Sequence, residues 1–202
     1  MKIIEITGVA GVGKSYILNK LLEKKKYTIS DMEIINKYHI LDIYLVYLFF
    51  RTKNSLKLFR IILNITKELN MSLLDKINFI RNTIKKVGKQ SYLSNINFVD
   101  NRVVLVDEGI SHIYQNIVTG KTQNNLKILI LINEFISLVK LPDEVIVIDA
   151  PTPIIINRLK ERGHKRLSSY KDIELFVENS KRNISIIGKK FPKIKTFINK
   201  EQ

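Results

Sequence analysis

Several residue types are absent from this 202-residue chain or scarce in it, and each absence excludes a class of protein. The chain has no cysteine, which excludes a disulfide framework, a thiolate zinc site and a cysteine nucleophile. Acidic residues are few: 19 Asp and Glu stand against 34 Lys and Arg, giving a formal net charge of +15. Hydrophobic residues still make up 45%, so we expect one globular domain over residues 1–202.

The positive charge is the most unusual feature of the composition. It is spread over both halves of the chain and accompanies many isoleucine, lysine and asparagine residues, a bias expected of AT-rich coding sequence. We therefore interpret the charge as compositional bias and do not expect nucleic acid as a partner. Such a surface would nevertheless attract an anionic small substrate.

No segment of the sequence predicts export or a membrane span. The apolar N-terminus contains Glu5 and is not followed by a small-residue cleavage site, so it does not resemble a signal peptide. The most apolar run, residues 40–50, is too short to cross a bilayer. We interpret this aromatic-rich run as the core of a helical region and expect a cytoplasmic protein.

The hydrophobic pattern alternates between the periods of strands and helices. Short apolar runs predict strands at residues 2–7, 27–30, 103–106, 145–148 and 193–199. Helical periodicity is predicted at residues 15–25, 109–119, 125–139, 152–162 and 171–190. This alternation predicts a three-layer α/β sandwich with a central parallel sheet. From residue 31 to about residue 90 the pattern is helical almost throughout, with breaks near 51–55 and 70–72. Residues 31–100 are expected to form an α-helical cap beside the sheet.

The first motif follows the first predicted strand. Residues 8–15, GVAGVGKS, satisfy G-x-x-x-x-G-K-[ST], which narrows the fold to the P-loop NTPase type. Glycines let successive backbone N–H groups turn toward phosphate oxygens at the positive end of the next helix. Lys14 is expected to reach the β- and γ-phosphates of ATP, and the Ser15 hydroxyl to bind Mg²⁺. The expected nucleotide contacts are Gly8, Gly11, Val12, Gly13, Lys14, Ser15 and Tyr16.

The second motif is an acidic pair after the middle strand. Residues 103–109 read VVLVDEG, so that four apolar residues run into Asp107 and Glu108. A carboxylate at this strand end would lie beside a Mg²⁺ ion held by Ser15, and we expect Asp107 to hold the metal through water. Glu108 is a candidate catalytic base, a second metal contact or a structural carboxylate.

A third segment follows the next strand. It consists of Asp149-Ala150-Pro151, a helix with two arginines four residues apart, and a short basic loop. Arg158 and Arg162 share one helical face, and Arg166 follows Gly163 in the loop. Taken alone, this pattern would also fit the solvated end of a basic helix.

With these segments in this order, the chain resembles the thymidylate kinase and deoxynucleoside kinase branch of P-loop kinases. The resemblance is carried by motifs in residues 2–25 and 103–166. It implies a lid, residues 158–171, that closes over ATP, with one lid arginine also near the adenine. We assign Arg158 to nucleotide binding, and Arg162 and Arg166 to catalysis. These families commonly have Asp-Arg where this chain has Asp107-Glu108, and their acceptor-binding segments are not recognisable between residues 31 and 100.

The residue that accepts a proton depends on the acceptor. An alcohol needs a carboxylate base, and Asp31 and Glu33 follow the second predicted strand, while Glu108 follows the third. Asp31 also fits a helix N-cap. A phosphate acceptor would instead need cations in the cap, for which the candidates are Arg51, Arg60 and Arg81.

We therefore expect an ATP- and Mg²⁺-dependent kinase of a small-molecule acceptor. A nucleoside or nucleoside monophosphate is the leading acceptor class, followed by a sugar or another small alcohol. The alternative is a P-loop NTPase that acts as a switch or partner-binding module, with Glu108 activating water. A homodimer stays open as an assembly. The three histidines, at positions 39, 112 and 164, have no metal-ligand spacing.

Overall fold

The computed structural model describes residues 1–24, 27–37, 40–96, 102–117, 125–163, 169–187, 191 and 193–199. Strands and helices alternate along them. The strands are β1 (Lys2–Gly8), β2 (Thr28–Ser30), β3 (Val103–Asp107), β4 (Glu144–Asp149) and β5 (Ile194–Ile198). The helices are α1 (Lys14–Lys24), α2 (Asp31–Lys37), α3 (Asp42–Phe50), α4 (Ser55–Glu68), α5 (Leu73–Asn95), α6 (Ile110–Ile117), α7 (Leu126–Leu138), α8 (Thr152–Glu161) and α9 (Tyr170–Ile187).

The five strands form one parallel sheet in the order β2-β3-β1-β4-β5. β1, β3 and β4 are largely buried on both faces because helices cover both sides of the sheet. In the register of β1 and β3, Ile6 lies opposite Asp107, and in that of β1 and β4, Gly8 lies opposite Ile148. The carboxyl ends of these strands therefore meet at one edge of the sheet, where P-loop folds bind ligands.

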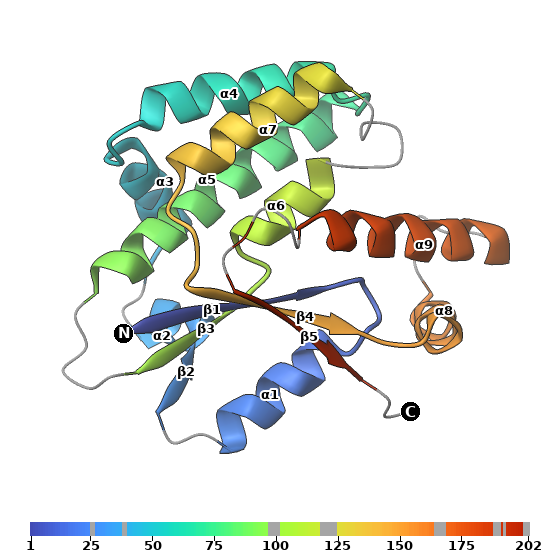
Figure 1. Ribbon diagram of the computed structural model, residues 1–202. Coiled ribbons are helices and arrows are strands. Elements are labelled where there is room, and N and C mark those ends of the chain that lie inside the picture. The colour runs from blue at the N-terminus through green and yellow to red at the C-terminus, as the bar shows by residue number, and fades with distance from the viewer. Residues whose placement is uncertain are drawn as a thin grey trace.

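The helices cover the two faces of the sheet unequally (Figure 1). Helix α1 lies on one side, and α4, α5, α6, α7 and α9 lie on the other. One cluster of buried residues joins β1 to α1 and α8, and includes Ile6, Val12, Ile17 and Ile155. A larger cluster joins the upper helices to β4, with Phe49, Leu58, Ile62 and Phe135 at its centre.

Within the cap, α3 and α5 pack with their backbones in close approach. A Cβ atom added at Gly88 of α5 would lie 1.9 Å from the carbonyl oxygen of Leu45 in α3, so only glycine fits there. Helix α5 is consequently held along its length between α3 and the helices above the sheet. This packing fixes where the part of α5 around Gly88 lies relative to the carboxyl ends of the strands.

The parallel sheet, the flanking helices and the two breaks in the cap are as predicted. The ends of several helices differ: α5 continues to Asn95, and α9 begins at Tyr170. The aromatic run in α3 is only partly core, which corrects its interpretation as buried. Phe49 is buried, whereas Tyr44, Tyr47 and Phe50 are exposed, because one face of α3 points away from α5. No helix among the described residues is long and apolar enough to cross a membrane.

Candidate active site

The P-loop connects the end of β1 to the start of α1, as the motif predicts. Gly11 and Gly13 have φ of +89° and +88°, a region that residues with a Cβ rarely adopt. A Cβ atom at Gly13 would also lie 2.6 Å from the side-chain nitrogen of Asn199. That nitrogen donates a hydrogen bond to the Val12 carbonyl, at 2.9 Å, and tethers the loop to the end of β5.

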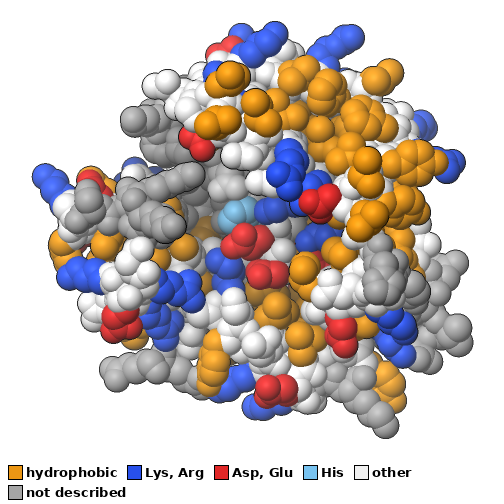
Figure 2. Space-filling view, turned by 180° about the vertical axis from the view of Figure 1, so that it is seen from behind, with side chains coloured by type: hydrophobic (Ala, Val, Ile, Leu, Met, Phe, Trp, Pro, Cys, Tyr) orange, Lys and Arg blue, Asp and Glu red, His pale blue; other side chains and the backbone are white. Residues whose placement is uncertain are grey.

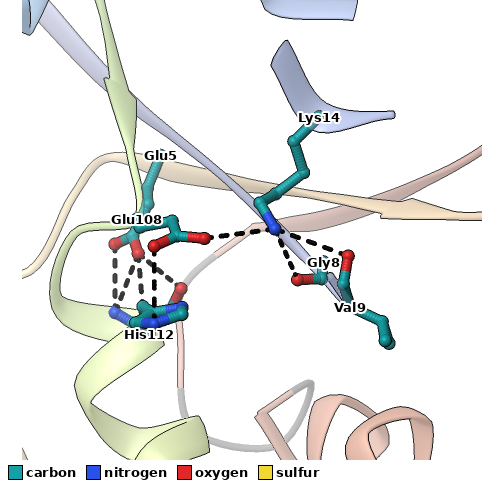
Figure 3. A network of polar contacts seen from close by, with 7 residues as sticks. Glu5, Gly8, Val9, Lys14, Glu108 and His112 are labelled. Atoms are coloured by element: carbon teal, nitrogen blue, oxygen red, sulfur yellow. Dashed lines mark hydrogen bonds and ion pairs between the residues drawn. The ribbon is translucent and has the colours of Figure 1, made fainter. Parts of the chain in front are cut away.

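Lys14 lies across the opening of this loop. Its ammonium donates hydrogen bonds to the carbonyl oxygens of Gly8, at 3.1 Å, and Val9, at 3.4 Å. It also lies 3.1 Å from Glu108 Oε1 (Figure 3). Lys14 therefore links the phosphate loop directly to the acidic pair after β3.

Glu108 lies between Lys14 and His112. Its second carboxylate oxygen is 3.5 Å from His112 Nε2, so that the two partners hold opposite sides of the carboxylate (Figure 3). Burial alone would raise the pKa of the Glu108 carboxyl, but His112 and the Lys14 ammonium outweigh it and hold the pKa below its usual value. Burial lowers the pKa of His112 to about 4, so this ring is neutral at pH 7.

A buried carboxylate fixes the segment that carries Glu108. Glu5 of β1 accepts hydrogen bonds from the backbone N–H of Ser111, at 3.0 Å, and of His112, at 3.4 Å, at the start of α6. Burial raises its pKa, and the bonds from Ser111 oppose that rise. Gly109 lies against this carboxylate, since a Cβ there would be 2.9 Å from Glu5 Cδ. The turn between β3 and α6 is therefore pinned to β1.

Asp107 and Ser15 lie where the motifs predict a metal site. Asp107 ends β3 beside β1, and one of its oxygens is buried with no partner among the described residues. Burial raises the pKa of Asp107, and the neighbouring Glu108 charge raises it further. An orphaned carboxylate oxygen at the end of β3 and an exposed hydroxyl, that of Ser15 at the start of α1, are both oxygen donors, the type of ligand that Mg²⁺ takes.

The other two candidate bases lie in different surroundings. Asp31 follows β2 and is buried, with one oxygen paired to Lys89 of α5 and the other without a partner in the described chain. Asp31 is not among the residues that line two cavities near the P-loop, one of about 490 Å³ and one of about 890 Å³. Glu33 is exposed on α2, where its backbone N–H bonds the Ser30 hydroxyl.

The nucleotide side has a cavity of about 490 Å³ next to the P-loop. Arg158 donates to the carbonyl of Gly11, at 3.2 Å, and so reaches the loop from α8. Arg162 follows α8 and is exposed at the rim. The described lining residues are Gly11, Gly13, Tyr16, Arg158, Glu161, Arg162 and Asn199. Arg166, the third predicted lid arginine, lies outside the described residues.

A second cavity, of about 890 Å³, opens on the far side of Glu108. Its lining is mostly polar, and Figure 2 shows acidic and basic side chains around a histidine in a hollow of this face. Helix α5 contributes Asp75, Asn78, Phe79, Asn82, Thr83 and Lys86, and the end of β3 with α6 contributes Glu108, His112, Ile113 and Asn116. Asn70, Met71 and Ser72 complete it.

The structure thus brings together the P-loop, Asp107, Glu108 and Arg158, as the motifs predict. Arg51, Arg60 and Arg81 are not among the residues that line the larger cavity; all three are exposed, and Arg81 pairs with Asp42. Sequence reasoning missed Lys86, His112, Asn199 and Glu5. The only sequence signal for Lys86 was its spacing of four from Asn82 on one helical face.

Comparisons with known proteins support the fold. No family model matches the sequence, and no curated protein sequence is significantly similar to it. Among solved structures, the chain is similar to deoxyadenosine kinase from M. mycoides with the products dCMP and a flexible dCDP bound. The sequence identity is 16% and the TM-score is 0.53, and the match covers 98% of this chain and 89% of that one. The same enzyme with bound dATP matches at 16% identity and a TM-score of 0.53, covering 98% and 90%. The chain therefore has the fold of a P-loop deoxynucleoside kinase.

Proposed function

We propose that this chain is an ATP- and Mg²⁺-dependent kinase that phosphorylates a hydroxyl group of a nucleoside. One observation carries the proposal: Glu108 touches the P-loop lysine on one side and lines a polar cavity of about 890 Å³ on the other. A carboxylate at that junction can contact both a phosphate donor and an acceptor. The solved neighbours with this fold are deoxyadenosine kinases, which favours a nucleoside as the acceptor.

On the donor side, the P-loop backbone and Lys14 would hold the phosphates of ATP. The glycines allow the positive φ values with which the loop backbone can turn its N–H groups toward a phosphate. Ser15 and Asp107 would hold Mg²⁺, which neutralises phosphate charge when bound. Arg158, which already reaches the Gly11 carbonyl, would contact the nucleotide beside the loop.

On the acceptor side, Glu108 would accept the proton of the acceptor hydroxyl. The hydroxyl oxygen forms a bond to the γ-phosphorus as the bond from that phosphorus to the β,γ-bridging oxygen breaks, and the electron pair leaves with ADP. The low pKa of Glu108 keeps it ionised and able to accept the proton. Two carboxylates, Asp75 and Glu108, line this cavity against one ammonium, Lys86, so its described lining carries a net negative charge, which favours a neutral acceptor over a monophosphate.

The lid arginines would complete the donor side. Arg162 lies at the rim of the nucleotide cavity, one turn of helix beyond Arg158. Its guanidinium would approach the transferring phosphoryl group when the lid closes, where a fixed positive charge stabilises the transition state. Arg166 has the same proposed role.

The test is an acceptor screen with ATP, read by mass spectrometry of the phosphorylated product, with ADP release measured in parallel. We expect one nucleoside class to be phosphorylated, and Glu108→Gln to lower kcat by about 10²–10³-fold. Glu33→Gln, which changes an exposed carboxylate on α2, is the matched control and should retain activity. ADP release without transfer to any acceptor would contradict the kinase proposal and identify an NTPase.

A further inference from the structure

Lys86 holds an unusual place in the larger cavity. It lies on α5 and is the only lysine or arginine among the described residues that line the cavity. Asn78, Asn82 and Lys86 are spaced four residues apart, so they form one line along a single face of the helix. This line ends at Lys86, beside Glu108 at the inner end of the cavity.

The neighbouring lysines of α5 have partners, whereas Lys86 has none in the part of the chain that the structure describes. Lys85 lies 2.7 Å from Asp42 of α3, and Lys89 pairs with Asp31. No hydrogen bond or ion pair joins the Lys86 ammonium to any residue within the described ranges. Burial lowers its pKa to about 8, although the charges of Glu108 and Glu5 oppose the shift. The group is therefore still largely protonated at pH 7, in a position that disfavours its charge.

A charge kept in such a position without a partner is available to a ligand. A buried ammonium group without a charged partner lowers the stability of the folded protein, so such a group commonly has a function. A cation in a partly dry cavity also acts more strongly than one in water. Lys86 lines, from α5, the same cavity as Glu108, which is the cavity proposed above to hold the acceptor.

We propose that Lys86 contacts the reacting end of the acceptor and stabilises the negative charge that develops on the acceptor oxygen and the transferring phosphoryl group. This assignment rests on the kinase proposal. Lys14 would act on the same phosphoryl group from the donor side, so the group would pass between two lysines with Glu108 beside both. Asn78 and Asn82 would bind the body of the acceptor along α5.

A purely structural role is the competing explanation. Lys86 could act only as a general counter-charge for Glu5, Asp107 and Glu108, whose charges all reach it. A counter-charge would affect folding and the positions of these carboxylates. It would not distinguish the transition state from the bound acceptor. The two roles therefore predict different values of kcat for a variant without the Lys86 charge, measured at saturating acceptor. A transition-state contact predicts a lower kcat, and a counter-charge predicts an unchanged one.

The experiment compares Lys86→Met, Lys86→Arg and the matched control Lys85→Met, with thermal unfolding used to confirm that each variant is folded. We expect Lys86→Met to lower kcat about 10²-fold, while the Kd for ATP changes less than about twofold. Lys86→Arg, which keeps the charge, should recover most of kcat, and Lys85→Met should behave as wild type. That pattern would establish the assignment.

Three results would overturn it in different ways. If wild type phosphorylates its acceptor and Lys86→Met keeps full kcat, or loses only ATP affinity, Lys86 is a structural counter-charge and the kinase proposal stands. If the wild-type chain phosphorylates no acceptor in the screen, the kinase proposal fails and the role of Lys86 fails with it. A folded Lys86→Arg that is as inactive as Lys86→Met would also exclude a role based on charge.

Discussion

Replacing Lys86 by methionine should stabilise the fold while it impairs transfer. Methionine has a similar length and carries no charge, so it fills the same space against α6 and the end of β3. The wild-type ammonium is held where burial disfavours its charge and no ion pair compensates. Removing it removes that cost, and this opposition of stability to activity is typical of functional groups.

The size of the effect follows from the pKa. A fall from 10.5 to about 8 is a shift of about 2.5, and each unit corresponds to about 1.4 kcal/mol, so the upper limit is about 3.4 kcal/mol. The side chain borders a cavity that opens to solvent, which weakens this cost by about half. We therefore expect Lys86→Met to raise the free energy of unfolding by about 1–2 kcal/mol at neutral pH, less any packing lost with the longer lysine stem.

The effect should depend on pH in a defined direction. Below the folded pKa of about 8, Lys86 is charged in both the folded and the unfolded chain, and the full free-energy cost of burying its charge is present. Between about 8 and 10.5 the unfolded chain binds more protons than the folded one, so wild-type stability rises relative to the variant. Above that window the amine is neutral in both states and the charge-related difference disappears.

Urea unfolding of wild type and Lys86→Met at about pH 7 and about pH 9.5 measures this difference directly. Lys85→Met is the control; it removes an exposed ion pair with Asp42 and should lower stability by a few tenths of a kcal/mol, about the value of a surface pair. The reasoning is refuted if Lys86→Met is less stable than wild type at about pH 7, or if the gap does not narrow at the higher pH.

Three further substitutions test other parts of the structure. Gly88→Ala should lower the free energy of unfolding by about 3 kcal/mol, since its Cβ would meet the Leu45 carbonyl at 1.9 Å; an unchanged urea midpoint would contradict this packing. Asp107→Asn should raise the Mg²⁺ concentration needed for half-maximal activity about tenfold, because an amide carries no charge, and a magnesium titration measures it. Arg162→Ala should lower kcat about 10²-fold with little change in the Kd for ATP; loss of ATP affinity alone would show that Arg162 has no role in the transition state.

The parts of the site that are local in sequence could be predicted. The loop at residues 8–15 is defined by glycines and a lysine at fixed spacing, and its conformation follows from those residues. Asp107 could be placed because an apolar run into an acid marks the end of a buried strand. The parallel sheet followed from the same runs. These features depend on neighbours within a few residues, which a single sequence displays.

The contacts of α5 could not be predicted in the same way. Lys85, Lys86 and Lys89 are three similar residues in one helix, and nothing local distinguishes them. Their different surroundings come from Asp42 on α3, Asp31 at the start of α2 and the charges at the end of β3, which only the tertiary fold brings near. For the same reason, the sequence could not show that Arg51, Arg60 and Arg81 are not among the residues that line the larger cavity. Charge alone does not show which face of a helix a residue occupies.

Glu5 shows how a structural carboxylate can determine the position of a catalytic candidate. In a strand of sequence KIIEIT it reads as an ordinary alternating polar residue, yet it is buried and bonded to residues 106 positions away. By holding the start of α6, it constrains the two-residue turn in which Glu108 has a φ of +52°, a conformation that costs about 1 kcal/mol for a residue with a side chain. That strained backbone directs the Glu108 carboxylate to Lys14 rather than along the strand. The contact between the phosphate loop and the larger cavity therefore depends on a buried acid that is not itself among the described residues lining the cavity.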